Sequence, residues 1–390
     1  MRIVMIGQNG IPARQGGVER HVEELSTRLA RFARNEVTVY TRPHFTGSWR
    51  RSYKGVRLVP LRSIPTKSLD TITHTLRSVL HALLFVRPDV YHFHGVGPTT
   101  LAWMPRVFAP RATVVSTFHS QDRFNRKWGI LGRIFLYFGE WATMRFPHRT
   151  IAVSRSLQQI ARREYATEIE YVPNGVDIRR TRKTDRLKKH GLKRDGYVLV
   201  VSRLIPLKRV HEIVEAYKHI KTDMPLVIVG GSSYSDDYVE ELQQLAQEDK
   251  RVKLLGVQTG EALAQLFRSA RLFVTASETE GLPITLLEAA YSGAPLVVSD
   301  ITEHEEILAE DEGRFFIPGN ETQLVKAIRD SLRYDGSETA KARRRKLQRR
   351  IATEYDWNKI GEAVECVYEK AATDCRVHEQ HAPATQTKVA

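Results

Sequence analysis

Cysteine is scarce in this sequence, because the 390 residues contain only Cys366 and Cys375, both near the C-terminal end. This number cannot supply the disulfide framework of a small secreted domain, and it indicates a reducing compartment. Long apolar runs are also missing: the longest candidate, residues 79–86, is interrupted by His81 and is far shorter than the ~20 residues of a membrane-spanning helix. The opening MRIVMIG is predicted to be a β-strand, since no small-residue cleavage site follows a long apolar region.

Acidic residues are scarce in the first part of the chain. Residues 1–163 carry 26 Lys and Arg against 8 Asp and Glu, whereas the remainder carries 34 against 37. All of the net charge of +15 therefore comes from the first part. A basic half of this kind attracts nucleic acid, an anionic membrane surface or a phosphorylated ligand. The charge alone does not choose among these partners.

Short runs rich in β-branched residues alternate with helical patterns, which is typical of parallel βαβ units in an α/β fold. The alternation stops after the Asn-Gly-Val-Asp turn at residues 174–177, continues as a polar segment at 179–194, and then starts again. The length predicts about two domains, and doubly wound domains bind ligands at the carboxyl ends of their strands. The predicted strands are residues 2–6, 36–40, 90–94, 114–118 and 150–153, followed by 197–202, 225–229, 252–255, 272–275 and 295–299.

The first predicted strand runs into the loop GQNGIPARQGG, which ends at Gly16 and Gly17 just before a predicted helix. Glycines here let backbone N–H groups approach a ligand, and a helix N-terminus favours an anion. A turn that only needs glycine at positive φ explains the pair equally well. The spacing differs from the G-x-G-x-x-G fingerprint, and no acidic residue ends the second strand, so a nicotinamide dinucleotide is disfavoured.

A pair of cations follows the strand at residues 197–202. Arg203 comes directly after this strand, and Lys208 stands five residues later, where a helix is predicted to begin. The Arg fork and the Lys point charge at the carboxyl end of a strand suit a diphosphate group. The alternative is a solvated surface, which is the prediction for the next residue, Arg209.

Two carboxylates lie eight positions apart in the segment ETEGLPITLLEAA. Glu280 is predicted in the loop before a helix, and Glu288 in the first or second turn of that helix. Such carboxylates can accept hydrogen bonds from sugar or ribose hydroxyls, beside the backbone N–H groups of Gly281 and Leu282, while Pro283 pre-sets the helix start. A metal is less attractive, because no Asp-x-Asp and no histidine pair stands nearby at ligand spacing. The alternatives are that Glu280 caps the helix and Glu288 faces water.

Histidines end two predicted strands of the first half. His92 and His94 close the strand at residues 90–94, and His119 follows the strand at 114–118. Because ligands bind at the carboxyl ends of the strands, His94 and His119 are expected to point into the cleft. His92 is expected to be a core residue with its hydrogen bonds satisfied.

These motifs, taken in order, resemble the retaining nucleotide-sugar glycosyltransferases of family four, the glycosyl transferases group 1 type. The resemblance runs over nearly the whole chain, through MIGQNGIPARQGGVERHVEEL, VPNGVD, SRLIPLKR and the E-x7-E of Glu280 and Glu288. The family often has Gly-Phe-Gly after the first of these glutamates, whereas this chain has Gly-Leu-Pro. The resemblance implies the GT-B fold, an α/β architecture in which two Rossmann-like doubly wound domains face each other across a cleft.

The resemblance also implies a division of the chain. Residues 1–178 are expected to form the acceptor-side domain and residues 179–355 the nucleotide-sugar-binding domain. A C-terminal helix at residues 356–375 is expected to return to the first domain. The polar tail at residues 376–390 is expected to be disordered.

Each motif residue receives an implied role from the family. Cations neutralise the departing diphosphate, carboxylates hold the hydroxyls of the sugar and the ribose, and neither a metal nor a cofactor is expected. The histidine after the strand at 114–118 is expected to steer the donor sugar near its anomeric carbon. The implied catalytic set is His119, Glu280, Arg203 and Lys208; the donor-binding set is Gly16, Gly17, Arg203, Lys208, Glu280, Gly281, Leu282, Pro283 and Glu288; and His94 and Asn174 line the acceptor side or the cleft.

The implied activity is retaining, metal-independent transfer of a hexose-type sugar from a nucleotide diphosphate sugar to an acceptor hydroxyl. The acceptor is expected to be a lipid-linked or growing glycan in cell-envelope or exopolysaccharide biosynthesis. Cytoplasmic location is expected, with peripheral attachment to the inner face of the plasma membrane, since residues 124–149 mix aromatic and basic side chains as an interfacial helix does. An ordinary core helix is the alternative for that segment.

Two other functions stay open. One is a nucleotide-sugar epimerase of the same fold, which would interconvert the donor sugar without an acceptor. The other is a nucleic-acid-binding protein that uses the basic half. It is disfavoured because the aromatic residues form no stacking platform and no recognised nucleic-acid motif.

Overall fold

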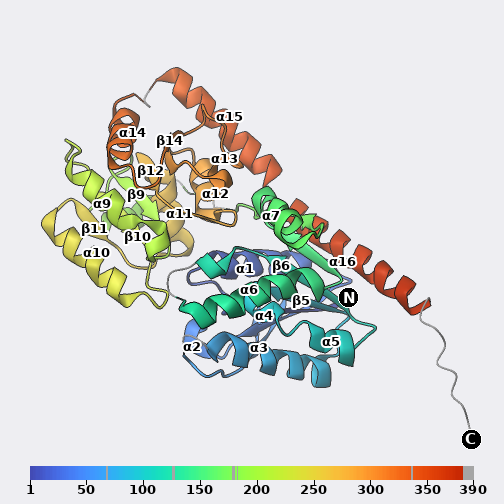
Figure 1. Cartoon of the computed structure of the whole chain (residues 1–390). Helices are drawn as coiled ribbons and strands as arrows, with labels where there is room; N and C mark the ends of the chain where they lie inside the picture. The colour runs from blue at the N-terminus through green and yellow to red at the C-terminus, as the bar shows by residue number, and fades with distance from the viewer. Residues whose placement is uncertain (67–68, 125–127, 178–180, 182, 335–336, 381–390) are drawn as a thin grey trace, which may run out of the picture.

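The computed structural model describes residues 1–66, 69–124, 128–177, 181, 183–334 and 337–380. Two parallel β-sheets with helices packed around them form the two halves of the molecule (Figure 1). The predicted α/β architecture with two Rossmann-like halves is confirmed. The predicted division at residues 178 and 179 falls in a segment that is largely outside the described residues, so the exact boundary stays a prediction.

The first sheet has eight strands in the order β3-β4-β2-β1-β5-β6-β7-β8, parallel throughout except for the β3–β4 pair. The order reverses at β1, which pairs with β2 on one side and β5 on the other. Such a reversal opens a crevice at the carboxyl ends of the strands. The strands are β1 (Arg2–Ile6), β2 (Glu36–Thr41), β3 (Ser52–Tyr53), β4 (Val56–Pro60), β5 (Val90–His94), β6 (Thr113–Phe118), β7 (Arg149–Ala152) and β8 (Glu170–Tyr171).

Helices cover both faces of this sheet, because its strands are apolar on both sides. Ile3 and Met5 of β1 belong to the core under α1, whereas Val4 and Ile6 belong to the core on the opposite face. This alternation is the period of two that a strand imposes on its side chains. The helices are α1 (Gly17–Leu29), α2 (Pro43–Thr46), α3 (Leu69–His81), the π-turn η1 (Ala82–Val86), α4 (Val96–Thr99), α5 (Trp103–Phe108), η2 (Asp122–Phe124), α6 (Ile130–Arg145) and α7 (Arg155–Tyr165).

The second sheet is parallel throughout, with the strand order β11-β10-β9-β12-β13-β14. Its reversal lies between β9 and β12, so the crevice opens beyond the ends of these two strands. The strands are β9 (Val198–Val201), β10 (Leu226–Val229), β11 (Val252–Leu254), β12 (Leu272–Thr275), β13 (Leu296–Ser299) and β14 (Arg314–Phe316). The helices are α8 (Asp185–Lys188), η3 (Pro206–Lys208), α9 (Val210–Lys218), α10 (Asp236–Glu248), α11 (Gly260–Ser269), α12 (Ile284–Ser292), α13 (Thr302–Glu305), α14 (Glu321–Tyr334) and α15 (Glu338–Glu354).

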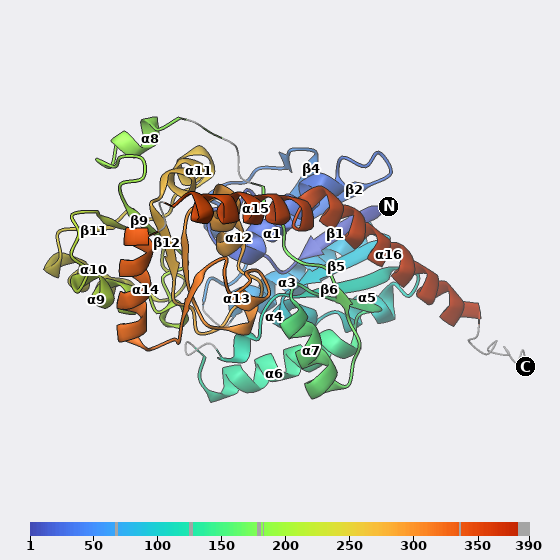
Figure 2. The same ribbon diagram turned by 90° about the horizontal axis from the view of Figure 1, so that it is seen from above.

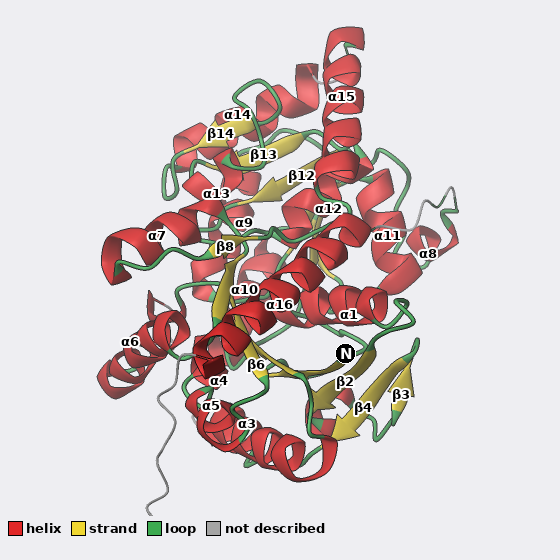
Figure 3. Ribbon diagram, turned by 90° about the vertical axis from the view of Figure 1, so that its right-hand side faces the viewer, coloured by secondary structure: helices red, strands yellow, loops and turns green. Residues whose placement is uncertain are grey.

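The last helix, α16 (Trp357–Gln380), returns to the first half. It packs against α1 and β6 and buries Trp357 and Tyr368 in the core under α1. Figure 2 shows α15 over the second half and α16 continuing over the first, and Figure 3 shows α16 running beside α1. The chain thus crosses twice between its halves. The helix continues to Gln380, so the expectation of a disordered tail from residue 376 is wrong for residues 376–380, and residues 381–390 lie outside the described part.

Among the residues that the structure describes, no helix combines the length and the apolar character that a bilayer span requires.

Candidate active site

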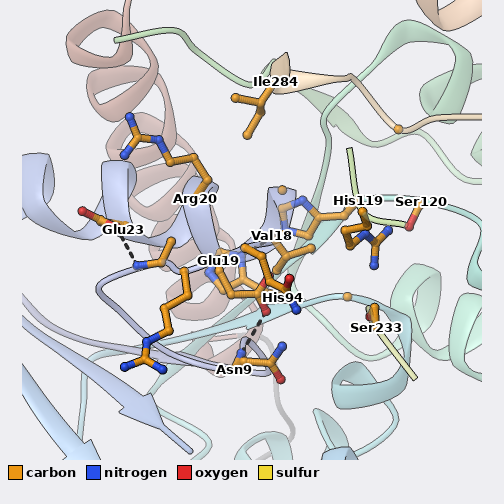
Figure 4. Close-up of a pocket in the computed structure, with 18 of the residues that line it drawn as sticks. Asn9, Val18, Glu19, Arg20, Glu23, His94, His119, Ser120, Ser233 and Ile284 are labelled. Carbon is orange, nitrogen blue, oxygen red and sulfur yellow. Dashed lines mark hydrogen bonds between the residues drawn. The ribbon is translucent and has the colours of Figure 1, made fainter. Parts of the chain in front are cut away.

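A cavity of about 1090 Å³ lies where the carboxyl ends of the two sheets face each other. Its wall is built from both halves: Figure 4 shows Val18, Glu19 and Arg20 of α1 on one side, and Ser233 and Ile284 of the second half on the other. The structure brings every predicted site residue to this one wall. These residues are Gly16, Gly17, His94, His119, Asn174, Arg203, Lys208, Glu280, Gly281, Leu282, Pro283 and Glu288.

The two glycines of the first loop play different structural parts. Gly16 has φ +98°, and a Cβ added there would stand 2.1 Å from a carboxylate oxygen of Glu19. That carboxylate accepts a hydrogen bond of 3.1 Å from the backbone N–H of Asn9 and so closes the loop (Figure 4). Gly17 is the first residue of α1, and a Cβ added there would meet no described atom within 4 Å. Gly16 therefore supplies the positive φ that the turn requires, while Gly17 leaves a helix N-terminus open to a ligand.

The basic pair lies beyond β9, as the sequence predicts. Arg203 is exposed on the cavity wall, whereas Lys208, in η3, is largely buried and forms an ion pair with Glu280. Burial lowers the pKa of Lys208, and although Glu280 opposes this shift, Arg203 adds to it. The ion pair joins two side chains that the sequence assigns to different parts of a ligand.

Arg209 is not the solvated residue that the sequence predicts. Its guanidinium forms ion pairs with Glu278 and Glu212, and its side chain is only 23% exposed. Its backbone has φ +47° at the junction of η3 and α9. Arg209 therefore anchors the loop that carries Lys208 to the loop that carries Glu280.

Glu280 is held in place by two partners rather than capping a helix. Besides Lys208, it accepts a hydrogen bond of 2.7 Å from the hydroxyl of Ser277, and no side-chain hydrogen bond caps the start of α12. Burial is the largest single influence on the Glu280 carboxyl and would raise its pKa. The charge and hydrogen bond of Lys208, with smaller contributions from His304 and Ser277, together bring the pKa below its ordinary value. Glu280 is therefore an ionised acceptor, and the capping alternative is wrong.

Glu288 lies in the second turn of α12 and is only 6% exposed, so the alternative that it faces water is wrong. Burial raises the pKa of its carboxyl to about 7, partly opposed by the charge of Arg20 in α1. Arg20 in turn forms an ion pair of 2.8 Å with Glu24 and donates to the backbone carbonyl of Asp177. Arg20 is not among the predicted site residues, although its place one turn after Gly17 marks the inner face of α1.

The turn Gly281-Leu282-Pro283 is tied to the first half. The Asn174 side chain donates a hydrogen bond of 2.7 Å to the carbonyl of Leu282, and its amide oxygen lies 2.8 Å from Nδ1 of His21. Asn174 therefore connects α1 to the loop before α12. This bridge crosses the cleft close to the chain's passage between the two halves.

Four histidines gather at the carboxyl ends of β5 and β6. His92 bonds Tyr368 through Nδ1 and Thr117 through Nε2, so the prediction of a satisfied core residue is confirmed. His94 and His119 lie on the cavity wall, with Nδ1 of His94 3.2 Å from Nε2 of His119. His21 stacks edge-on against His119 and was not predicted. Burial lowers the pKa of His21 to about 4 and the pKa values of His94 and His119 well below their ordinary value, so all three imidazoles are neutral.

Two family descriptions match the chain, one for each half. Glycosyltransferase family 4 matches residues 15–180, and glycosyl transferases group 1 matches residues 182–350. A glycogen synthase of Mycobacterium tuberculosis is 26% identical, with 94% of each chain covered. A GDP-mannose-dependent alpha-(1-6)-phosphatidylinositol monomannoside mannosyltransferase of the same species is 24% identical, covering 83% of this chain and 87% of its own length.

Solved structures share the fold. Anabaena HepE, solved in complex with UDP-glucose, superimposes with a TM-score of 0.78 at 20% identity, covering 95% of this chain and 100% of its own. The two matched segments together reach from the end of the Gly-rich loop into α15, and the facing sheets place the predicted motif residues on one cavity. The chain therefore belongs to glycosyltransferase family 4, as a group 1 glycosyltransferase with the two-domain GT-B fold.

Proposed function

We propose that this protein is a retaining glycosyltransferase that moves a hexose-type sugar from a nucleotide diphosphate sugar to an acceptor hydroxyl. The observation that carries the proposal is the single cavity on which Arg203, Lys208, Glu280 and Glu288 meet the open helix N-terminus at Gly17. A diphosphate, a sugar and a ribose present the charges and hydroxyls that this set of side chains complements.

The diphosphate occupies the side of the cavity beyond β9. Arg203 offers a fork of donors, and Lys208 adds a point charge already oriented by Glu280. Negative charge grows on the phosphate as the sugar departs, so cations held at that position stabilise the transition state more than the ground state. The open space at Gly17 lets the first half approach the same phosphates. No metal is required to bridge the diphosphate.

The carboxylates hold the donor's hydroxyl groups. Glu280, ionised beside Lys208, accepts hydrogen bonds from the sugar, together with the backbone N–H groups of Gly281 and Leu282. Glu288, buried deeper in α12, accepts hydrogen bonds from the ribose. Ribose hydroxyls suit Glu288, because burial disfavours the charged form of its carboxyl. Hydroxyl donors satisfy this buried carboxyl without bringing a further charge into the site.

His119 steers the sugar rather than removing a proton. Its pKa lies well below the ordinary value because it is buried, so the neutral imidazole is a weak base. Retention then follows from attack on the same face from which the phosphate departs, with the leaving phosphate taking the acceptor proton. Glu280 is not a nucleophile in this scheme, because Lys208 and Ser277 hold it in place. His94 and Asn174 shape the acceptor side of the cleft.

We propose a lipid-linked or growing glycan as the acceptor, in cell-envelope or exopolysaccharide biosynthesis. The support is α6, at the edge of the first half (Figure 3), which buries Leu136, Ala142 and Met144 but leaves most of its large apolar side chains exposed. Exposed Arg133 and Arg145 lie on the same helix, which fits an anionic bilayer surface. One relative named above acts on a phosphatidylinositol-linked sugar. The exposed side chains of α6 are Ile130, Leu131, Ile134, Phe135, Tyr137, Phe138 and Trp141.

This membrane proposal places the protein on the cytoplasmic face of the plasma membrane, with no nucleic acid as partner. Arg126 and Lys127, which the sequence analysis counts in the same basic segment, lie outside the described residues. Flotation with vesicles of anionic and of neutral lipid measures the attachment. Equal binding to both kinds of vesicle, or binding to neither, would contradict the proposal that the protein attaches to the membrane by electrostatic attraction.

A thermal-shift screen of nucleoside diphosphates and nucleotide sugars tests the donor class, because a ligand that binds only the folded chain raises the melting temperature. The stabilising donor is then incubated with a glycan acceptor in the presence of EDTA. We expect a product whose anomeric configuration, read by NMR, equals that of the donor. Inversion, or loss of transfer in EDTA, contradicts the proposed mechanism. Interconversion of the donor sugar without acceptor would instead identify an epimerase.

A further inference from the structure

Three of the histidines meet behind the cavity wall. His21 comes from α1, His94 ends β5, and His119 follows β6. One ring nitrogen from each lies within 4.8 Å of those of the other two, and all three side chains are buried. Figure 4 shows His94 and His119 beside the start of α1. The cluster therefore joins three segments that are far apart in the sequence.

Two nitrogens of this cluster lack a hydrogen-bond partner within the described part of the chain. They are Nε2 of His21 and Nε2 of His94, both fully enclosed. Of these two, only Nε2 of His21 is available to an ion shared with His119, because His94 faces His119 through Nδ1. A buried polar atom without a partner is costly, so a native structure retains it where a ligand or water fills the need. His92 differs from these two histidines, because both of its ring nitrogens have hydrogen-bond partners, in Tyr368 and Thr117.

Asn174 fixes the orientation of His21. Its amide oxygen lies 2.8 Å from Nδ1 of His21 and is itself positioned by the bond from Asn174 to the carbonyl of Leu282. An acceptor at Nδ1 places the proton there and leaves the lone pair of Nε2 free. Metal-binding histidines are held in this way, with the second nitrogen donating to an oxygen of the protein.

The spacing of the other two rings suits the same chemistry. Nδ1 of His94 and Nε2 of His119 form a hydrogen bond of 3.2 Å. This separation is close to the roughly 3.3 Å between two nitrogens that bind one tetrahedral zinc ion at about 2.0–2.1 Å, so an ion that binds both replaces the proton they share. Neutral imidazole is the form that binds a metal, and zinc is among the ions that it suits.

We propose that His21, His94 and His119 form a binding site for a divalent transition-metal ion of the zinc class. His21 contributes Nε2, and the fourth coordination position opens toward the cavity, because His94 and His119 form part of its wall. The ion is an inhibitor rather than a cofactor, since it occupies the imidazole that steers the donor sugar. This last clause rests on the proposed function, whereas the metal site itself does not.

Metal binding is tested on the full chain without an affinity tag, stripped with EDTA and dialysed. Cobalt(II) added to this protein is expected to give the intense visible bands of tetrahedral nitrogen coordination, and zinc is expected to bind at one ion per chain and displace them. His119→Ala and His21→Ala should each abolish the bands. His219→Ala is the matched control, because this exposed histidine pairs with Glu321 on the second half. The proposal is overturned if wild type gives no tetrahedral bands, or if both cluster variants keep them.

A second variant covers the case in which a buried histidine cannot be replaced without unfolding. Asn174→Ala keeps all three histidines but removes the group that orients His21, together with the hydrogen bond to the carbonyl of Leu282. Zinc affinity is expected to fall about ten- to hundredfold while circular dichroism stays that of wild type. Unchanged affinity in this variant would contradict the assigned geometry. No donor or acceptor takes part in these measurements, so their failure is distinct from a failure of the proposed function. Inhibition of transfer by added zinc, relieved by EDTA, then tests whether the bound ion is an inhibitor. Undiminished transfer with zinc bound would contradict that role.

Discussion

Gly281 lies so close to His119 that a Cβ built on Gly281 would stand 1.8 Å from the backbone carbonyl oxygen of His119. Gly281 belongs to the loop between β12 and α12, and His119 follows β6, so this contact joins the two halves of the molecule at the cavity. Only a residue without a side chain permits such an approach. The spacing of the cleft is therefore set in part by the absence of one methyl group.

Gly281→Ala should force this contact apart. We expect a loss of about 1–3 kcal/mol in the free energy of unfolding, as for other overpacked positions, together with reduced transfer because the donor loop moves away from His119. Urea denaturation and turnover measure the two effects. Gly129→Ala is the control, because a Cβ added at Gly129 meets no described atom within 4 Å. If the two variants behave alike, the contact does not hold the cleft.

Lys208→Ala and Arg203→Ala should each lower kcat by about 10²–10³, the range seen when one preorganised group that stabilises the transition state is removed. Steady-state transfer with saturating donor measures the effect. Lys218→Ala in α9 is the control, since Lys218 pairs with Glu215 and Glu248 and does not line the cavity. Near-wild-type turnover in both cavity variants would falsify the diphosphate assignment.

Glu288→Gln should separate stability from binding. The folded-state pKa of Glu288 is raised to about 7 from an ordinary 4.5, so the folded chain binds this proton more tightly than the unfolded chain does. The contribution of Glu288 to stability is thus present below pH 4.5 and is lost as the pH rises to about 7. Glutamine escapes this loss, and the variant should be more stable than wild type by up to about 3 kcal/mol above pH 7.

Urea denaturation of the Glu288→Gln variant and wild type at pH 5 and pH 8 measures this gain, which should be larger at pH 8. Calorimetry at pH 8 should show weaker nucleotide binding by the same variant, because the amide replaces a carboxylate that accepts hydrogen bonds from the ribose. A variant that is more stable and binds nucleotide as well as wild type would make Glu288 a structural residue only.

Ile134→Glu should weaken binding to anionic vesicles without unfolding the protein, because this α6 side chain is 61% exposed and the change adds a charge of the membrane's own sign. Flotation measures the bound fraction. Ile317→Glu is the control, since Ile317 is 53% exposed on the second half. Equal loss in both variants would point to net charge alone, and no loss in either would show that α6 does not touch the bilayer.

Much of the fold could be predicted from local pattern. Strands β1, β5 and β12 begin and end where the sequence analysis places them, because both faces of a parallel sheet are buried and its strands read as short apolar runs. Helix α15 was missed, since only Leu347 and Ile351 in its basic sequence are buried and the apolar period is weak. Strand β14 was also missed, because its three residues are too few to show an alternation of buried and exposed side chains.

The sequence by itself determined which chemical groups stand at the ends of the strands, because a hydrophobic run and the residue that follows it are neighbours in the chain. Only the tertiary structure decided what those groups contact. Lys208 and Glu280 are 72 residues apart, and His21 and Asn174 are 153 apart. Such pairs, and the burial that raises the pKa of Glu288, depend on how two separate sheets face each other, which no local pattern of residues encodes.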